Sequence, residues 1–217
     1  MTGRRPALGR KVEHDERSRA YRAVTAPTLR SVKHRRYVGI LDQGQLGSCT
    51  GNALAGAIDT APLHKAGRNL HEADAVKLYS LATTLDDDPQ NYPPTDTGAS
   101  GLAVCKAGVQ LGYLASYGHA FSLDEALAAL VVSPVIIGIN WYEDMFDPDS
   151  AGFVHPGGAL AGGHEVELVG LDVKGSYVWA ANSWGTSWGL KGYFKMAFAD
   201  LGRLLSEDGD CTIPVSV

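Results

Sequence analysis

Apolar residues recur every three or four positions along the first half of the chain, which is the spacing of one face of an α-helix. This pattern predicts helices over residues 13–24, 49–65, 72–85, 99–111 and 123–130. The first of these is short and weakly patterned. Pro62 is expected to end or kink the second, because proline cannot continue the helical hydrogen bonding. Ser122 and Glu125 form a capping-box pair before the last.

Beyond residue 130 the pattern changes to short runs rich in β-branched and aromatic residues. Strands are predicted over residues 37–41, 131–139, 164–172, 177–181, 193–197 and 211–217. Residues 174–176 are expected to form a hairpin turn and the acidic stretch 86–98 a loop. Helices first and strands second predict an α+β fold of two lobes. The helical lobe covers about residues 45–115 and the β lobe about 116–217, with a boundary near 112–120.

The composition is that of an ordinary globular chain. Its 217 residues are 45% hydrophobic and 20% charged, enough for one large domain or two small lobes. No apolar run approaches the roughly 18 residues of a membrane span, so we expect neither a membrane partner nor a signal peptide. The three cysteines fit free thiols, with Cys105 in the core, although a Cys105–Cys211 bridge stays open. No cysteine and histidine spacing indicates a metal, and no cofactor is expected.

Charge is distributed unevenly along the chain. Residues 1–40 contain 11 Lys and Arg and three acids, a net charge of +8, and the remaining residues carry −13. Such a basic segment can be a solvated tail, a nucleic-acid contact or a strap on its own acidic surface. Nucleic acid is the weaker choice, because the segment lacks interleaved aromatic residues and the acidic body would repel phosphates. Residues 1–30 are therefore treated as an arm, separate from a domain over 31–217.

The candidate nucleophile is Cys49, which opens the helix predicted from that residue. A thiol at a helix N-terminus lies at the positive end of the helix dipole, which favours the reactive thiolate. Six residues upstream, the Gln43 side chain could donate a hydrogen bond to an oxyanion. The simpler interpretation of Cys49 is a buried structural cysteine.

Two later motifs complete a candidate site. His164 follows Gly162 and Gly163 at the start of a predicted strand, and Asn182 ends the next strand after a hairpin. Pairing of these strands could place the Asn182 amide beside the His164 ring and fix its tautomer. Taken separately, His164 could be a core histidine and Asn182 a turn residue. The stretch 141–149, rich in aromatic and acidic residues, either rims the cleft or packs as a loop.

Cysteine, then a distant histidine, then asparagine in an aromatic, glycine-rich block is the order found in papain-like cysteine peptidases, and the chain resembles that family over about residues 30–217. The resemblance implies a two-lobe fold with a helical lobe and an antiparallel, β-barrel-like lobe, and an active site between them. It implies that Trp184 covers the histidine–asparagine contact, while Trp188 and Tyr193 are expected to pack in the core. Ser48, Gly162 and Gly163 are expected to support or line the substrate site.

The chain also departs from the family pattern. The usual Cys-Gly-Ser-Cys-Trp around the nucleophile is here Leu46-Gly47-Ser48-Cys49-Thr50, so one usual disulfide and one tryptophan that lines the substrate site are absent. The spacing from cysteine to histidine is shorter than usual. The compact form resembles the bacterial and viral branch of these enzymes, and a cytoplasmic or virion-associated location is expected.

The sequence therefore predicts a cysteine endopeptidase with a Cys49–His164–Asn182 triad, a Gln43 oxyanion hole and a thioacyl intermediate. Its expected partner is a protein or peptide substrate, with no main role for nucleic acid, and the expected state is a monomer. A catalytically silent binding protein, or an acyl or peptidyl transferase on the same scaffold, is the alternative. Residues 1–30 could be a short pro-segment or strap across the cleft.

Overall fold

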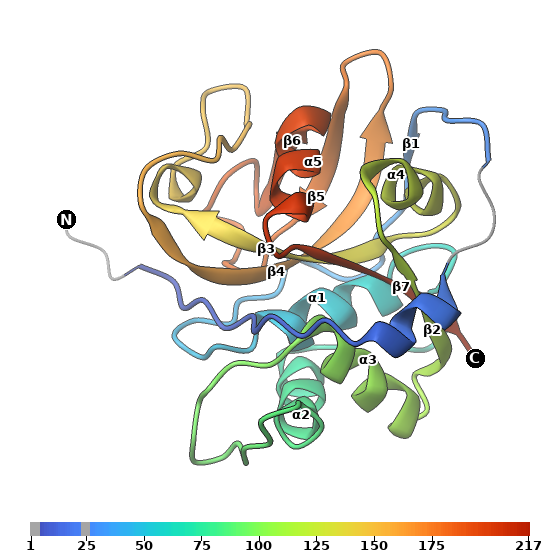
Figure 1. The fold of residues 1–217 in the computed structure, drawn as a ribbon, viewed down its shortest axis with the longest axis vertical. Helices are drawn as coiled ribbons and strands as arrows, with labels where there is room; N and C mark the ends of the chain where they lie inside the picture. The colour runs from blue at the N-terminus through green and yellow to red at the C-terminus, as the bar shows by residue number, and fades with distance from the viewer. Residues whose placement is uncertain (1–4, 23–26) are drawn as a thin grey trace.

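In the computed structural model, which describes residues 5–22 and 27–217, one group of helices gathers below the sheet and other helices lie among the strands (Figure 1). The helices are η1 (Glu16–Tyr21), α1 (Cys49–Ile58), α2 (Glu72–Thr83), α3 (Gly101–Gln110), α4 (Leu123–Val132), η2 (Glu143–Phe146) and α5 (Phe198–Ser206). The strands are β1 (Val32–Lys33), β2 (Leu114–Ala120), β3 (Val135–Tyr142), β4 (Leu160–Asp172), β5 (Tyr177–Ala181), β6 (Tyr193–Ala197) and β7 (Asp210–Ser216). The predicted α+β, two-lobe fold is confirmed.

Helix α1 is the central element of the helical part. All ten of its residues are buried, because its alanines and glycines let it pack closely between its neighbour α2 and strand β4. It ends at Ile58, with Asp59 as the C-cap, whereas the sequence predicted a helix that continues to residue 65. The buried Asp59 carboxylate accepts a hydrogen bond from the Leu70 N–H and lies 3.5 Å from the Arg68 guanidinium. These contacts turn the chain out of the helix before Pro62.

The strands form one antiparallel sheet in the order β2-β7-β3-β4-β5-β6, with β1 paired to β4. The sheet is open, with β2 and β6 at its edges, and is not closed into a complete barrel. The long β4 lies between α1 and the β core, and residues on its two faces therefore meet different surroundings. His164, Val166 and Leu168 lie on the core face, while Glu165 and Glu167 face the helical side.

Several elements differ from the sequence prediction. Residues 37–41 are not a strand, because their backbone bonds to loops: Tyr37 donates to Asp59, and Leu41 accepts from Gly185. Residues 131–132 complete the last turn of α4 rather than starting a strand. Where the sequence predicted a helix over residues 13–24, the structure has the short 3-10 helix η1. Residues 23 and 24 of the predicted helix lie outside the described ranges.

The sequence prediction missed β2 and α5. Strand β2 falls on the predicted boundary between the lobes and pairs with β7. It is a polar edge strand that lacks the apolar alternation of a half-buried strand. Helix α5 is short and contains Gly202, a poor helix former. Strands β5 and β6 have the predicted bounds, and all three cysteines are free and buried, so no Cys105–Cys211 bridge forms.

None of the helices in the described ranges has the length and apolar content needed to cross a bilayer. Within the same residues, no group of three or more histidine, cysteine or acidic side chains is arranged to hold a metal ion.

Candidate active site

Cys49 is the first residue of α1 and is fully buried. Burial raises the pKa of its thiol to about 12. The backbone N–H groups of Glu165, Gly9 and Thr50 act in the opposite direction, because each approaches the sulfur and favours its anion. Ser48 precedes the helix and donates its hydroxyl to Asn52 at 3.0 Å, so it supports the helix start. In this closed form the sulfur is a neutral thiol.

His164 and Asn182 lie next to each other, as their strands' pairing suggested. Nε2 of His164 lies 2.8 Å from Oδ1 of Asn182, and the same oxygen accepts the Ser183 N–H at 2.8 Å. Two donors on one atom identify it as the amide oxygen, so the imidazole proton is on Nε2. Nδ1 has no hydrogen-bond partner among the described residues. Burial lowers the pKa of His164 to about 4.

Two tryptophans enclose the His164 ring. Trp184 stacks on it with ring centroids 4.7 Å apart and an interplanar angle of 25°. Trp141 meets it edge-on at 4.9 Å and is fully buried. Together they keep water from the contact with Asn182, which strengthens that hydrogen bond. Trp188 contacts Trp141 from the partly buried rim of the β core.

The backbone next to His164 approaches the cysteine. The residue that follows His164, Glu165, directs its backbone N–H toward the Cys49 sulfur. No hydrogen bond joins Cys49 to Nδ1 of His164 among the described residues. The site thus contains a neutral thiol and a neutral imidazole whose free nitrogen is Nδ1.

The Gln43 amide is fixed in one orientation. Its Oε1 accepts the Ser183 hydroxyl at 2.6 Å, and its Nε2 donates to the Leu46 carbonyl at 2.9 Å. The second Nε2 proton points to the Ala7 carbonyl, 3.2 Å away. The backbone of Gln43 also donates to Ser183 at 2.9 Å, which ties this loop to the one that carries Asn182. The Gln43 side chain therefore already donates to a peptide carbonyl, that of Ala7.

That carbonyl belongs to the N-terminal arm of the chain. From here on, the arm means residues 5–13, the part that lies along the site. In Figure 1 this segment, drawn in dark blue, runs across the molecule in front of α1, with α3 below it in this view. Its backbone forms a parallel bridge with Ala99: Ala99 donates to Gly9 at 2.8 Å, and Lys11 donates to Ala99 at 2.9 Å. Arg10 donates to the Gly163 carbonyl at 3.0 Å.

Glycines line the path of the arm. A Cβ on Gly9 would collide with the Gly47 carbonyl, and one on Gly163 would collide with the Arg10 carbonyl. Gly162 lies against the Leu8 side chain. The arm can therefore lie flat against the backbone of Gly47 and Gly163, and both Cys49 and His164 are fully buried in this arrangement.

Ion pairs fix the arm to the body. Its basic side chains meet acids that are distant in sequence, in the pairs Arg5–Glu143, Arg10–Asp210 and Lys11–Asp86. One pair has the opposite arrangement of charge: the acidic Glu13 of the arm accepts a hydrogen bond from Lys106 of the body at 3.1 Å. Beyond the arm, Arg22–Glu125 and Arg36–Glu167 continue the series. The basic segment thus lies along its own acidic body.

Four residues near the site were not identified from the sequence as part of it: Arg10, Glu165, Asp210 and Trp141. A signal for Glu165 was present, because two glutamates alternate within the apolar stretch 164–169 and so share one face of a buried strand. Trp141 was grouped with a stretch that rims the cleft or packs as a loop. It lies instead in the β core beneath His164.

A family model described as papain family cysteine protease matches residues 87–213, more than half of the chain. The chain belongs to the papain family of cysteine proteases. The matched segment contains His164 and Asn182 but begins after Cys49. The candidate nucleophile Cys49 therefore lies outside the matched segment.

Individual relatives agree with this membership. A gut-specific cysteine proteinase of Caenorhabditis elegans is 30% identical over 149 residues, which cover 62% of this chain and 42% of that protein. A cathepsin B-like cysteine proteinase of the same nematode is 42% identical over 65 residues, covering 29% of this chain and 17% of the relative. The chain thus matches less than half the length of either relative.

Solved structures have the same fold. Xylellain, a cysteine protease from Xylella fastidiosa, superposes with a TM-score of 0.64 at 23% identity, covering 97% of this chain and 96% of that one. The bromelain protease from Ananas comosus, solved with the E64 inhibitor, gives 0.58 at 15% identity, covering 83% and 94%. These likenesses establish the papain-like architecture.

Proposed function

We propose that this member of the papain family is a cysteine endopeptidase whose nucleophile is Cys49, and that residues 5–13 hold it in an inactive form. The observation that carries the proposal is the His164–Asn182 hydrogen bond. It commits Nε2 to Asn182 and leaves Nδ1 as the basic nitrogen beside a thiol at a helix N-terminus.

In the first half of the reaction, departure of the arm hydrates the site, and the Cys49 proton moves to Nδ1 of His164. The thiolate attacks the substrate carbonyl carbon, forming a C–S bond while the carbonyl π electrons move to oxygen. The Gln43 side chain and the Cys49 N–H donate to this oxyanion. When the intermediate collapses, the C–N bond breaks and the leaving amine takes the proton from Nδ1.

In the second half, Nδ1 of His164 removes a proton from water as the water oxygen attacks the thioester. Collapse breaks the C–S bond and releases the carboxylic acid, and the thiol–imidazole pair is restored. Asn182 is a positioning residue, because it touches the imidazole and not the substrate. Transfer to an amine would pass through the same thioester, and the mass of the product distinguishes it from hydrolysis.

The arm supports an inactive resting form. It presents the Ala7 carbonyl to Gln43 and the Gly9 N–H to the sulfur, and it excludes solvent from Cys49. A substrate cannot occupy these contacts at the same time.

Labelling of Cys49 by a thiol-directed epoxide tests the proposal. After limited proteolysis of the arm, we expect one epoxide per chain on Cys49, as located by peptide mass mapping. His164→Ala should abolish this labelling and the hydrolysis of a denatured protein substrate. Labelling that spreads equally over Cys49, Cys105 and Cys211, with no dependence on His164, would contradict the proposal.

A further inference from the structure

Two backbone segments contact Gly9, the arm residue whose N–H approaches the Cys49 sulfur. A Cβ on Gly9 would lie 2.0 Å from the carbonyl oxygen of Gly47, in the nucleophile loop (residues 43–48). A Cβ on Gly98, in the peptide track (residues 98–99), would lie 2.1 Å from the Gly9 carbonyl oxygen. A peptide beside the proposed nucleophile therefore contacts both the nucleophile loop and the peptide track.

One chain of hydrogen bonds joins these two segments. The Gly98 N–H donates to the Tyr79 hydroxyl oxygen at 3.0 Å, and that hydroxyl donates to Oδ1 of Asp96 at 2.5 Å. Oδ2 of Asp96 accepts the Gly47 N–H at 2.9 Å. Hydrogen bonds to a carboxylate are roughly twice as strong as those between neutral groups. The side chains of Tyr79 and Asp96 therefore set the distance between the nucleophile loop and the peptide track.

Tyr79 is held rigidly by the packing of two helices. It lies in α2 and is fully buried. Helix α2 approaches α1 closely at Gly51, where a Cβ would lie 2.1 Å from the Ala75 carbonyl oxygen and 3.1 Å from Cβ of Tyr79. Burial raises the pKa of the Tyr79 hydroxyl, and the Asp96 carboxylate raises it further, so the hydroxyl stays a donor at neutral pH. The hydroxyl thus has a fixed place relative to the first turn of α1.

Asp96 forms the surface end of this chain of hydrogen bonds. The residue is exposed, although both of its carboxylate oxygens accept hydrogen bonds. All three cysteines are free, so no disulfide holds the nucleophile loop. Leu46 occupies the position of the first cysteine in the usual family pattern. The Asp96 carboxylate therefore ties the nucleophile loop to the peptide track without a covalent bond.

We propose that Asp96 is a positioning residue of the peptidase, which together with Tyr79 sets the spacing between the nucleophile loop and the peptide track. The inference rests on the proposed function, since it adds a residue to the same site. The arm pairs with Ala99 in the closed form, and a substrate takes this place once the arm leaves. A misplacement of about 1 Å between reacting groups can cost roughly 100-fold in rate. Asp96 acts through Gly47 and does not touch the reacting atoms.

The first experiment measures the tie without catalysis, by hydrogen exchange of single amides in the full-length chain. We expect Asp96→Ala to accelerate exchange of the Gly47 amide by roughly 10- to 100-fold, because its acceptor is lost. Asp96→Asn should keep most of the protection, since the side-chain amide oxygen still accepts from Gly47. Tyr79→Phe should accelerate exchange of the Gly98 amide in the same way. Unchanged exchange of Gly47 in Asp96→Ala would overturn the tie.

The second experiment separates the placement of a peptide from the reactivity of the thiol. In full-length Arg10→Ala, where the arm has lost its pairing with Asp210, Cys49 is modified either by iodoacetamide or by a peptidyl epoxide that lies along the peptide track. Both reagents need the arm displaced, so the ratio of their rates is independent of arm opening. Adding Asp96→Ala should lower the ratio of peptidyl epoxide to iodoacetamide rates by roughly 10- to 100-fold. Adding Asp96→Asn instead should keep the ratio within about threefold.

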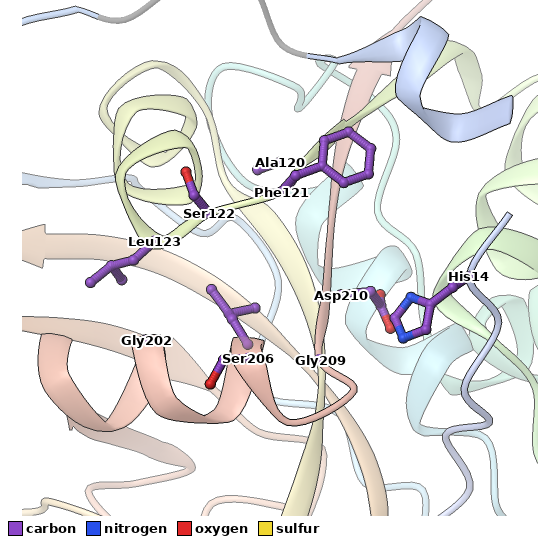
Figure 2. Close-up of a pocket in the computed structure, with 10 residues that line it drawn as sticks. His14, Ala120, Phe121, Ser122, Leu123, Gly202, Ser206, Gly209 and Asp210 are labelled. Carbon is purple, nitrogen blue, oxygen red and sulfur yellow. The ribbon is translucent and has the colours of Figure 1, made fainter. Parts of the chain in front are cut away.

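Two further variants test the mechanism. Tyr79→Phe should lower the ratio by a similar factor, and its combination with Asp96→Ala should lower it no further, because both break one chain of hydrogen bonds. Ser122→Ala is the matched control. Ser122 accepts the Glu125 N–H at 3.2 Å and lines a cavity of about 380 Å³ between the start of α4 and α5 (Figure 2). Its loss should lower stability and leave the ratio unchanged.

The outcomes separate the two proposals. If neither reagent modifies Cys49 in folded protein, the peptidase proposal fails, and exchange of the Gly47 amide still decides whether Asp96 ties the loop. If Cys49 reacts and the ratio is the same with and without Asp96→Ala, the positioning role is overturned while the peptidase proposal stands. Equal falls of the ratio in Asp96→Ala and Ser122→Ala would also overturn it, because they would reflect a general loss of stability. Circular dichroism of each variant confirms that it is folded.

Discussion

Nε2 of His164 lies 2.8 Å from Oδ1 of Asn182, and Trp184 stacks over the imidazole of this pair. The contact fixes the tautomer of the imidazole, with its proton on Nε2. It also raises the pKa of His164, in opposition to burial, because an amide oxygen favours the protonated ring.

Asn182→Ala removes that acceptor and should lower the pKa of the imidazolium in the open enzyme. The thiolate–imidazolium pair then loses its proton at lower pH, so the alkaline limb of the pH profile of kcat/KM should shift to lower pH. We also expect kcat/KM to fall by roughly 10- to 100-fold, since the ring loses its orienting bond. Asn182→Gln is the control for hydrogen-bonding capacity. A uniform loss of rate with an unshifted alkaline limb would indicate a merely structural role.

Gln43→Ala should separate oxyanion stabilisation from thiol reactivity. We expect kcat to fall by roughly 10²- to 10³-fold, the usual cost of one oxyanion-hole donor. Alkylation of Cys49 by iodoacetamide forms no oxyanion, so its rate in the open enzyme should change little. The matched control is the exposed Gln45→Ala, which should retain kcat. Equal losses of alkylation and hydrolysis in Gln43→Ala would argue against this role.

Arg10→Ala should loosen the arm in the full-length chain. The substitution removes the buried contacts with Asp210 and Asp208, and we expect modification of Cys49 by a small epoxide to accelerate by roughly 10- to 100-fold. Arg17→Ala is the matched control, because Arg17 is exposed and pairs with its near neighbour Asp15. Equal rates in wild type, Arg10→Ala and Arg17→Ala would show that Arg10 does not retain the arm.

Acid should destabilise the closed form through His164. Burial holds its pKa at about 4, below the ordinary value of 6.5, so the unfolded chain binds more protons between these values. The stability is fully present above about pH 6.5 and is lost as pH falls to about 4, a contribution of roughly 3 kcal/mol. Urea unfolding of wild type and His164→Gln at several pH values measures it. The difference between the two curves should change over this interval, and a constant difference would exclude the effect.

The short motifs around Gln43, Cys49, His164 and Asn182 could be recognised because each combines a chemically distinctive side chain with local glycines or aromatic residues. The strands on either side of Asn182 could also be predicted from the local sequence pattern, since β5 and β6 have their predicted bounds. By contrast, Arg10 meets Asp210 across 200 positions of sequence. No local periodicity encodes such a pairing, and a single arginine in a basic segment resembles its solvated neighbours. The arm's path and the place of Arg10 therefore became visible only in three dimensions.

Strand β2 and helix α5 were not predicted from the sequence for a related reason. Strand β2 is held by β7, so its extended form depends on a partner almost a hundred residues away. Helix α5 is stabilised by Leu201 and Leu204, which pack in the β core and outweigh the low propensity of Gly202. Tertiary contacts decided both elements.

The parallel bridge between Arg10 and Ala99 has a kinetic consequence for any incoming peptide. Because the arm is tethered to the body by the chain itself, its local concentration at the cleft is in the millimolar range or above. A free peptide that makes equally good contacts would have to exceed that concentration to displace it. The proposed function therefore requires that the tether be cut or its contacts weakened before turnover at ordinary substrate levels, and this event, rather than substrate affinity, would set the number of competent molecules.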